Sequence, residues 1–549
     1  MQHRTVSARL RRFAVLAAGI TLAGTATVAL SASGQAATAK ALPQIPSIGD
    51  VVPAPVSATS AKTPYRVTAT TVIFSQSGSA AATGIANQLA TELRRTTGFP
   101  LPVVTSAARR GPLADSGIAF LLNGASSLGT EGYKLAVTAS GVTVTANQAE
   151  GLFNGLQSLR QLLPAAADGS TKQAGPWTVP GGTISDQPRF SYRGAMLDVS
   201  RHFFPVSTVE HYIDEISLYK INYLHLHLSD DQGWRIAING MPDLTTIGGS
   251  TEVGGGAGGY YTQAQYKAIV AYAQSHYVTI VPEIDGPGHT NAALASDADL
   301  NCNGVAPPLY TGTDVGFSSF CVSKPITYSF LDTVISQLAA ITPGPYIHVG
   351  GDEAQSTTAA DYKTFEDQEL PIVSKYGKSA MGWHDITAVD PPTSVVAEFW
   401  GTTTTDANTA AAAARGNKVV MAPANKAYMD MKYTTATKLG QNWAGYTEVK
   451  DAYNWDPGNY LKGVTGSSVL GVEAPLWSET LVNMANIEYM AFPRLPALAE
   501  LGWSPESTHN WTAFAKRLAL QGPRWTAMGM NFYASPQVKW AAGTKGGTD

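Results

Sequence analysis

Acidic and aromatic side chains recur at the ends of short apolar runs in the C-terminal part of this 549-residue chain. Two of them are neighbours, Asp352 and Glu353, which follow the run Tyr346–Gly350 and one further glycine. Carboxyl groups of this kind can donate and accept protons, as general acid–base catalysis requires. The other run endings supply Asp198, Arg201, Asp230, Asp231, Glu283, Asp285, His289, Trp383, Asp385, Glu398, Trp400, Trp477 and Glu479.

Carboxylates interleaved with tryptophans are typical of a sugar-binding pocket, because hydroxyls need charged hydrogen-bond partners and sugar C–H faces need aromatic walls. Asp352 and Glu353 are adjacent, so their side chains point in different directions and do not form the opposed acid–nucleophile pair of an ordinary retaining glycosidase. Their spacing indicates one proton donor and one residue that serves a neighbouring part of the substrate. An isolated Asp-Glu pair would be an acidic turn, but here the preceding glycines and the other polar strand ends favour a site.

The apolar runs themselves predict the fold. They alternate with helical stretches such as Val209–Lys220 and Gln263–His276, and strands buried on both faces have this composition. The predicted strands are Ala195–Val199, Tyr223–Leu228, Thr279–Glu283, Tyr346–Gly350, Ala380–Trp383, Val395–Trp400, Lys418–Ala422 and Val469–Ala474. This series predicts an α/β fold with a (β/α)8 TIM barrel as the catalytic domain, whose chemistry lies at the C-terminal ends of the strands.

The regions around the barrel differ in composition. Residues 40–62 are rich in Pro, Ala, Ser and Thr and predict a linker. Residues 63–188 alternate short strands with two amphipathic helices, which predicts a small non-catalytic α+β domain. The catalytic barrel is expected over 189–535, followed by a C-terminal tail over 536–549.

The first 39 residues predict a secretory signal peptide. Four arginines precede an apolar run from Phe13 to about Leu30, and small residues follow it. We therefore expect a secreted, extracellular protein with no membrane association after cleavage. Its two cysteines, Cys302 and Cys321, are expected to form a disulfide, since an exported chain meets an oxidising environment.

Charge and composition exclude some partners. The formal net charge is −4 and the sequence has no basic stripe, so nucleic-acid binding is not expected. We expect neither a cofactor nor a metal ion. The pair His225 and His227 alternates with leucines inside a predicted strand, so both side chains share one face of the barrel wall and are interpreted as structural.

Five motifs in order resemble glycoside hydrolase family 20, the β-N-acetylhexosaminidases. The resemblance extends over essentially all of residues 50–535, including the small N-terminal domain. The motifs are Leu197-Asp-Val-Ser-Arg201-His-Phe-Phe, His225-Leu-His-Leu-Ser-Asp230-Asp-Gln-Gly-Trp-Arg, Pro282-Glu-Ile-Asp-Gly-Pro-Gly-His289, His348-Val-Gly-Gly-Asp352-Glu353 and Trp477-Ser-Glu479.

The resemblance implies a substrate and a mechanism. The substrate would be an oligosaccharide or glycoconjugate with a terminal, non-reducing β-linked N-acetylhexosamine, and its own 2-acetamido group would attack the anomeric carbon to give an oxazolinium intermediate. Glu353 would be the general acid and then the base, and Asp352 would orient the acetamido N–H. The resemblance also implies that Tyr428 hydrogen-bonds the acetamido oxygen and that Asp230 and His289 form a dyad behind Glu353. Trp383, Trp400 and Trp477 would form the walls of the pocket. Arg201 and Glu479 would hold the O3 and O4 hydroxyls, and Asp430 would reach toward O6.

Three alternatives remain at the level of sequence. A metal-dependent barrel hydrolase would use His225 and His227, but it needs further ligands that the last predicted strand does not supply. A catalytically inactive sugar-binding protein could use the same scaffold. A lacto-N-biosidase-like enzyme of the same family would release a disaccharide, whereas the expected contacts to O4 and O6 favour release of a monosaccharide.

Overall fold

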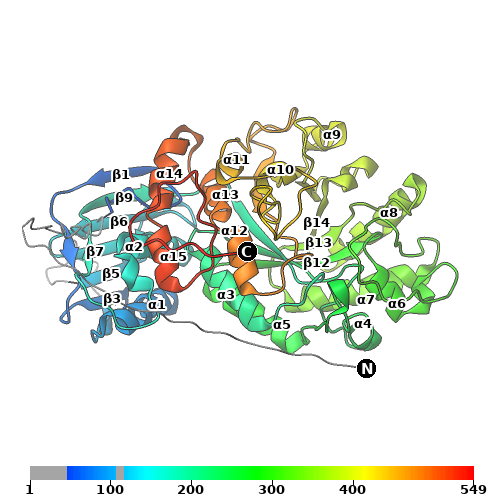
Figure 1. Ribbon diagram of the computed structural model, residues 1–549, viewed down its shortest axis with the longest axis horizontal. Helices are drawn as coiled ribbons and strands as arrows, with labels where there is room; N and C mark the ends of the chain where they lie inside the picture. Colours follow the sequence, from blue (N-terminus) through cyan, green and yellow to red (C-terminus); the bar gives the residue numbers. More distant parts are fainter. Residues whose placement is uncertain (1–45, 107–116) are drawn as a thin grey trace, which may run out of the picture. The chain divides into compact units, whose positions relative to one another are not determined.

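The structure is a computed structural model that describes residues 46–106 and 117–549. The predicted signal peptide, residues 1–39, and the first residues of the predicted linker, 40–45, lie outside the described residues. Within Gln44–Asp549 an N-terminal sheet domain precedes a barrel, and the chain colours of Figure 1 separate the two.

The N-terminal domain is a mixed sheet covered by two helices. The described part of the sheet has the order β1-β9-β6-β7-β5-β3-β4. Helices α1 (Ala80–Thr97) and α2 (Ala149–Leu162) pack on it, and their apolar faces form a separate core with Leu89, Leu93 and Leu156. The strands are β1 (Ser57–Ser60), β3 (Val72–Gln76), β4 (Val103–Ser106), β5 (Gly117–Leu121), β6 (Tyr133–Thr138), β7 (Gly141–Ala146) and β9 (Gly182–Asp186), with a separate pair β2 (Tyr65–Arg66) and β8 (Thr178–Val179).

The described part of the predicted linker, residues 46–62, is not a linker. Its strand β1 pairs antiparallel with β9, and Val51 and Val52 are fully buried. The linker prediction rested on the Pro, Ala, Ser and Thr content, but β1 is an edge strand whose four side chains are all exposed, so its composition resembles that of a loop.

The barrel confirms the predicted strand series. In the described chain, strands β10 to β17 pair in parallel and close on themselves through β10 and β17. Each observed strand overlaps the predicted one. The strands are β10 (Tyr192–Asp198), β11 (Tyr223–His227), β12 (Thr279–Gly286), β13 (Tyr346–Gly350), β14 (Ser379–Trp383), β15 (Val396–Phe399), β16 (Lys418–Met421) and β17 (Val469–Ala474).

Helices connect the strands around the outside of the barrel (Figure 1). Between β14 and β15 the connection is a 3₁₀ segment, His384–Val389, so the barrel departs from a regular β/α alternation at this point. The helices are α3 (Val206–Ser217), α4 (Asp243–Thr246), α5 (Gln263–Ser275), α6 (Asn291–Ser296), α7 (Pro325–Ile341), α8 (Ala359–Lys375), α9 (Ala407–Arg415), α10 (Ala424–Ala427), α11 (Val449–Tyr453), α12 (Met484–Ala491), α13 (Arg494–Trp503), α14 (Trp511–Ala519) and α15 (Gly522–Met528). Over the described residues, every helix is too short or too polar to cross a membrane.

Buried polar contacts join the sheet domain to the barrel. The guanidinium of Arg193 on β10 pairs with Glu131 of the sheet domain, and Arg524 on α15 pairs with Asp168. Gln161 on α2 donates to the carbonyl of Leu218, which follows α3, at 3.1 Å. Since these groups are buried, the two domains hold each other in one arrangement.

Candidate active site

The C-terminal ends of the barrel strands bring the predicted residues together. Asp230 follows β11, His289 follows β12, and Asp352 and Glu353 follow β13. The Nε2 atom of His289 lies 3.5 Å from Oε2 of Glu353 and 3.7 Å from Oδ2 of Asp352. The structure therefore places the adjacent carboxyl groups beside one imidazole at the rim of the barrel, where barrels of this kind carry their chemistry.

A tight turn after β13 sets the directions of the two carboxylates. Gly350 and Gly351 have φ angles of 72° and 98°, in the region that favours glycine. A Cβ on Gly350 would lie 1.7 Å from Oδ1 of Asp285, so only glycine fits there. Glu353 itself has a φ of 47°, a strained value for a residue with a side chain, and such strain is concentrated at functional sites.

Asp230 and His289 form a pair behind Glu353. Nδ1 of His289 lies 3.3 Å from Oδ1 of Asp230, while Nε2 of the same ring faces Glu353. Burial opposes the charged imidazole, but the carboxylates of Asp230 and Asp352 hold the pKa of His289 well above its ordinary value. Burial likewise opposes the charged form of Asp230, yet Arg201 and His289 hold its pKa far below the usual range. Both members of the pair are therefore charged, and the positively charged imidazolium of His289 faces the catalytic carboxyl groups.

The pKa of Asp352 is shifted in the opposite direction from the pKa of Asp230. Asp352 is buried with its Oδ1 atom free of any hydrogen-bond partner in the described chain. Burial raises the pKa of Asp352 to about 7, opposed by His289 and reinforced by Glu353. A buried carboxylate with an open acceptor atom is suited to receive an N–H group from a ligand.

Arg201 reaches the rim from the end of β10. One guanidinium nitrogen lies 2.8 Å from Oδ2 of Asp230, and another lies 3.6 Å from Asp198. The guanidinium also lies over the Trp477 ring at 4.7 Å, a cation–π contact. Arg201 is thus both part of a buried ion-pair network and adjacent to an aromatic wall.

Two further acidic groups, Asp430 and Glu479, have buried oxygens without hydrogen-bond partners among the described residues. These atoms are Oδ1 of Asp430 and Oε2 of Glu479. Burial raises the pKa of Asp430 well above its usual range, and the charge of Glu479 adds to this effect. Buried acceptors without partners are costly unless a ligand satisfies them, so these oxygens fit a hydroxyl-rich ligand.

Aromatic side chains gather at the same end of the barrel. Trp477 lies 5.6 Å from Trp383 and 6.2 Å from Tyr428, centroid to centroid. Trp400 donates its indole N–H to Asp385 at 2.9 Å. Trp383 is fully buried and donates to Glu283 at 3.0 Å, so in this structure it supports Trp477 from within rather than facing solvent.

One aromatic residue of the site was not predicted from the sequence. Trp443 is 55% exposed, although tryptophan is usually buried, and it contacts Trp400 and Tyr428 edge-on, each with centroids 5.9 Å apart. It lies in the loop segment Asn442-Trp443-Ala444-Gly445, outside any predicted strand end. A tryptophan two residues before a glycine, away from any apolar run, is the sequence signal that could have identified it.

A buried network inside the barrel supports the rim. Glu283 on β12 contacts His225, His227 and His348 and receives the Trp383 N–H. Although burial opposes the ionisation of Glu283, the surrounding histidines hold its pKa well below the usual range. His227 bridges Glu283 to Asp230, with Nε2 2.7 Å from Oδ2 of Asp230. The sequence assigned His227 to the barrel wall only, and it did not single out Glu283 as a support of the site.

The same contacts bear on the metal-hydrolase alternative. Both ring nitrogens of His225 face carboxylates, Glu473 at 2.8 Å and Glu283 at 3.0 Å. Both ring nitrogens of His227 are likewise engaged, by Glu283 and Asp230. A histidine coordinates a metal through a free ring nitrogen, so these two side chains are unsuited to that role in this arrangement.

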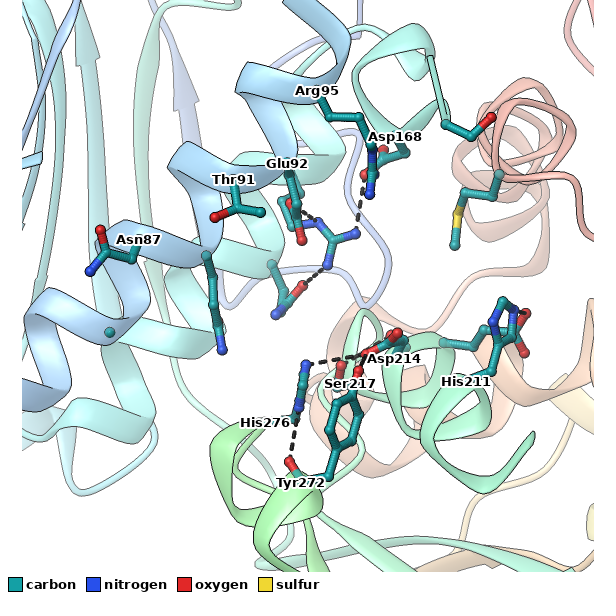
Figure 2. Close-up of a pocket in the computed structure, with 17 residues that line it drawn as sticks. Asn87, Thr91, Glu92, Arg95, Asp168, His211, Asp214, Ser217, Tyr272 and His276 are labelled. Atoms are coloured by element: carbon teal, nitrogen blue, oxygen red, sulfur yellow. Dashed lines mark hydrogen bonds and ion pairs between the residues drawn. The ribbon is translucent and has the colours of Figure 1, made fainter. Parts of the chain in front are cut away.

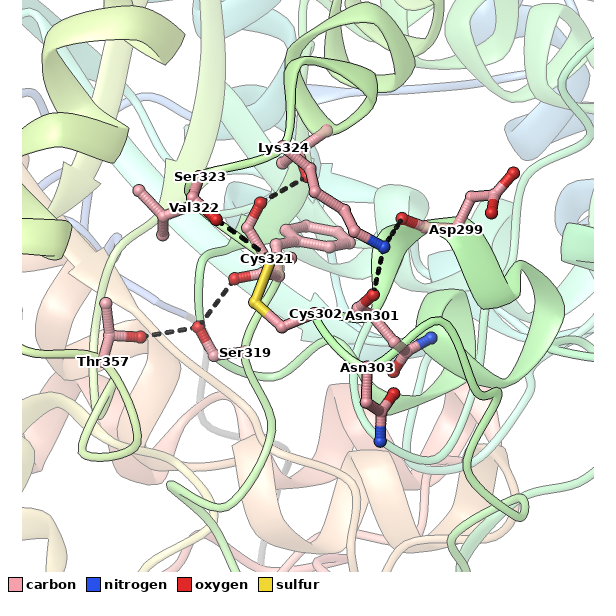
Figure 3. The surroundings of a disulfide bond; sticks show 12 residues. Asp299, Asn301, Cys302, Asn303, Ser319, Cys321, Val322, Ser323, Lys324 and Thr357 are labelled. Carbon is pink, nitrogen blue, oxygen red and sulfur yellow. Dashed lines mark hydrogen bonds between the residues drawn. A yellow bond between two sulfur atoms is a disulfide. The ribbon is translucent and has the colours of Figure 1, made fainter.

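The predicted disulfide is present and closes a loop beside the site. Cys302 and Cys321 are joined, with their Cα atoms 4.8 Å apart (Figure 3). Within the loop, Ser318 donates its hydroxyl to Asp231 at 2.5 Å and accepts the backbone N–H of Thr290. The loop therefore connects the segments that follow β11 and β12.

Comparison with known proteins decides the family. Residues 190–506 match the catalytic domain of glycosyl hydrolase family 20, and residues 49–187 match domain 2 of the same family. The chain belongs to glycoside hydrolase family 20. The domain 2 match falls on the sheet domain and the catalytic-domain match falls on the barrel.

The relatives of this family 20 chain include bacterial enzymes. It is 40% identical to a β-N-acetylhexosaminidase of Cellulomonas fimi over 412 residues, 75% of this chain and 82% of that protein. Among solved structures, the GH20 β-N-acetylhexosaminidase of Streptomyces coelicolor A3(2) is 53% identical with a TM-score of 0.87, covering 90% of this chain and 99% of its own. A Streptomyces plicatus N-acetyl-β-hexosaminidase in complex with Thio-NAglucal is 54% identical with the same TM-score, covering 90% and 98%.

Proposed function

We propose that this glycoside hydrolase is an exo-acting β-N-acetylhexosaminidase that removes terminal β-linked GlcNAc or GalNAc with retention of configuration. The observation that carries the proposal is the Asp352–Glu353 turn, which places one buried acceptor and one partly exposed carboxyl group beside the same imidazole. The family's named relatives, β-N-acetylhexosaminidases and β-hexosaminidases, support the same activity.

The proposed reaction begins with proton donation by Glu353 to the glycosidic oxygen. The bond from that oxygen to the anomeric carbon breaks while the substrate's acetamido carbonyl oxygen bonds to the same carbon, giving an oxazolinium ion. Oδ1 of Asp352, which has no partner among the described residues, accepts the acetamido N–H and balances the positive charge. Tyr428 donates its hydroxyl to the acetamido oxygen.

Water completes the cycle. Glu353, now a carboxylate, takes a proton from water, and the resulting nucleophile opens the oxazolinium ion on the face from which the leaving group departed. Asp230 and His289 position Glu353 through the 3.3 Å and 3.5 Å contacts of the imidazole. Two successive displacements at the anomeric carbon retain its configuration. The acetamido group thereby replaces the carboxylate nucleophile of an ordinary retaining glycosidase.

The remaining rim residues are proposed to hold the sugar. Arg201 and Glu479 bind the O3 and O4 hydroxyls, and Asp430 reaches toward O6. Trp400 and Trp477 cover the apolar faces of the ring, and Trp383 backs them from the interior. The buried, unpartnered oxygens of Asp430 and Glu479 support this arrangement, which crowds the O4 end and favours release of a monosaccharide rather than a disaccharide.

Hydrolysis of matched aryl substrates tests the proposal. We expect cleavage of aryl β-GlcNAc and aryl β-GalNAc and no measurable cleavage of aryl β-glucoside, because the glucoside lacks the acetamido nucleophile. Activity should be retained in a chelator. Equal rates on all three substrates would contradict the proposal, and binding of the sugars without any turnover would identify a sugar-binding protein instead.

We also propose that the protein is secreted and that residues 1–39 are removed as a signal peptide. The arginine-rich start, the apolar run and the small residues after it support this, as does the disulfide. N-terminal sequencing of protein recovered from culture medium tests it. A chain that stays in the cell with residues 1–39 intact would contradict it.

A further inference from the structure

Three ionisable side chains meet on the outer helices, away from the barrel rim. His211 and Glu215 lie four residues apart on α3, so they share one face of the helix. Glu488 reaches them from α12. Since α3 follows the first barrel strand and α12 follows the last, the cluster joins the two helices at the seam where the barrel closes.

The separations in this cluster are longer than those of ordinary hydrogen bonds. Nε2 of His211 lies 3.4 Å from Oε1 of Glu215 and 3.5 Å from Oε1 of Glu488, whereas N–H···O bonds have lengths of about 2.7–3.2 Å. A tetrahedral Zn²⁺ with ligand bonds of about 2.0–2.1 Å holds its ligand atoms about 3.4 Å apart. The two separations from His211 therefore match two edges of a zinc coordination shell.

Glu215 needs a partner that the described residues do not supply. It is 1% exposed, and neither of its carboxylate oxygens accepts a hydrogen bond from a described residue. Glu488 is also buried; its Oε2 atom accepts the backbone N–H of Asn531 at 2.7 Å, and its Oε1 atom faces His211. A buried carboxylate left unsatisfied is destabilising, so the unpartnered oxygens of Glu215 beside the His211 imidazole point to a ligand.

The charge of the cluster favours a divalent cation. Glu215 and Glu488 are both buried, and beside a neutral imidazole their two carboxylates carry two negative charges. A divalent cation bound by all three groups would balance these charges.

We propose that His211, Glu215 and Glu488 bind one divalent cation of the Zn²⁺ class. One imidazole nitrogen and carboxylate oxygens are the ligand types that zinc accepts, and all three ligand atoms lie within 4.8 Å of one another. His211 is half exposed, so a further coordination position faces solvent. The cation would tie α3 to α12 and stabilise the closure of the barrel.

A second histidine, His276, lies close to the cluster and provides a control. His211 and Glu215 line a cavity of about 590 Å³ between the sheet domain and the barrel, and His276 lies on the same cavity (Figure 2). His276 also faces a carboxylate, Asp214, at 3.2 Å. Asp214, however, is 47% exposed and already accepts a hydrogen bond from Tyr272 at 2.7 Å. His276 therefore serves as a control histidine that lacks an unsatisfied buried partner.

Calorimetric titration of ZnCl₂ into the metal-free full chain, without an affinity tag, tests the proposal. We expect one Zn²⁺ per chain, a higher melting temperature in its presence, and no comparable binding of Mg²⁺, which prefers octahedral oxygen ligands. His211→Ala and the isosteric Glu215→Gln should each weaken the binding at least about tenfold and abolish the thermal shift. His276→Ala should leave both unchanged.

Two results would overturn the proposal. One is the absence of Zn²⁺ binding to the wild-type chain, which does not depend on any variant folding correctly. The other is Zn²⁺ binding that both His211→Ala and Glu215→Gln retain at wild-type strength, since the ion would then occupy another place.

Discussion

Asp352 is the residue whose charge the proposed chemistry needs most. It must be a carboxylate to balance the oxazolinium ion, and burial raises its pKa to about 7, against the opposing charge of His289. A raised pKa means that the carboxyl group is neutral below about pH 7. Activity that requires the ionised form is therefore lost as the pH falls through this value.

The pH profile of kcat/KM checks this prediction, because it reports groups of the free enzyme. We expect an acidic limb with an apparent pKa near 7, absent from Asp352→Asn, whose residual activity should be lower by about 10²–10³-fold. Asp367→Asn on the exposed face of α8 is the control and should retain the wild-type profile. A limb near pH 4, where an ordinary aspartate titrates, would contradict the assignment.

Most individual residues that the structure brings together at the rim could be named from the sequence. Asp230, His289, Asp352 and Glu353 could be placed at the rim, since parallel strands bring their C-terminal ends together. Glu283 was expected there too, but β12 continues to Gly286, so Glu283 lies inside the barrel. Only the closed barrel reveals that His227 contacts both Glu283 and Asp230. Trp443 lies in a loop whose path no periodicity predicts.

The elements that hold these residues include the loop closed by Cys302 and Cys321. The disulfide links residues 19 positions apart, and the loop-closure model assigns it about 3 kcal/mol of stability. The backbone around it is also tied down, since Lys324 donates to the carbonyls of Asp299 and Asn301 (Figure 3). The loop reaches Asp231, so it also orders the segment that carries Asp230.

We predict that the double variant Cys302→Ala/Cys321→Ala loses about 3 kcal/mol of unfolding free energy. Urea denaturation measures the loss. A reductant should destabilise the wild-type chain by a similar amount and leave the double variant unchanged. A difference below about 0.5 kcal/mol between the two chains would show that the loop is held by its other contacts.

Elements differ in how well their sequences predict them. The eight barrel strands of the described chain are buried on both faces, and their apolar runs identify them. Strands β1 and β4, at the two edges of the N-terminal sheet, were not predicted, and neither was β9, which lies between β1 and β6. Edge strands need no apolar pattern, because one or both of their faces meet solvent; the exposed side chains of β1 are an example.

For the molecule as a whole, buried ion pairs unite the sheet domain and the barrel. Arg193 is fully buried, donates to the carbonyls of Phe190 and Lys220 at 2.8 Å each, and pairs with Glu131 of the sheet domain. Removing one partner of a buried pair leaves a charge without compensation, which costs about 3–5 kcal/mol. Without Glu131, Arg193 would still donate to the carbonyls of Phe190 and Lys220, so the expected loss of unfolding free energy lies toward the lower end of this range.

We therefore predict that Glu131→Gln lowers the unfolding free energy by about 3 kcal/mol. Glu131 and Arg193 lie in different domains, so we expect the two domains to unfold together. Circular dichroism and tryptophan fluorescence should therefore report one shared transition in the wild type and one in Glu131→Gln. Asp367→Asn, which removes an exposed pair on α8, should change stability by less than about 0.5 kcal/mol. Two separate transitions, with only one shifted, would show that the domains are stabilised independently.

The central claim is that the substrate supplies its own nucleophile while Asp352 and Glu353 serve that attack. Hydrolysis of aryl β-glucosaminides carrying acetyl, fluoroacetyl, difluoroacetyl and trifluoroacetyl groups on nitrogen tests it most directly. Each fluorine withdraws electrons from the amide carbonyl, so the account predicts that kcat falls stepwise along the series. A kcat that does not change with fluorination, together with a sugar covalently bound to a protein carboxylate, would contradict it.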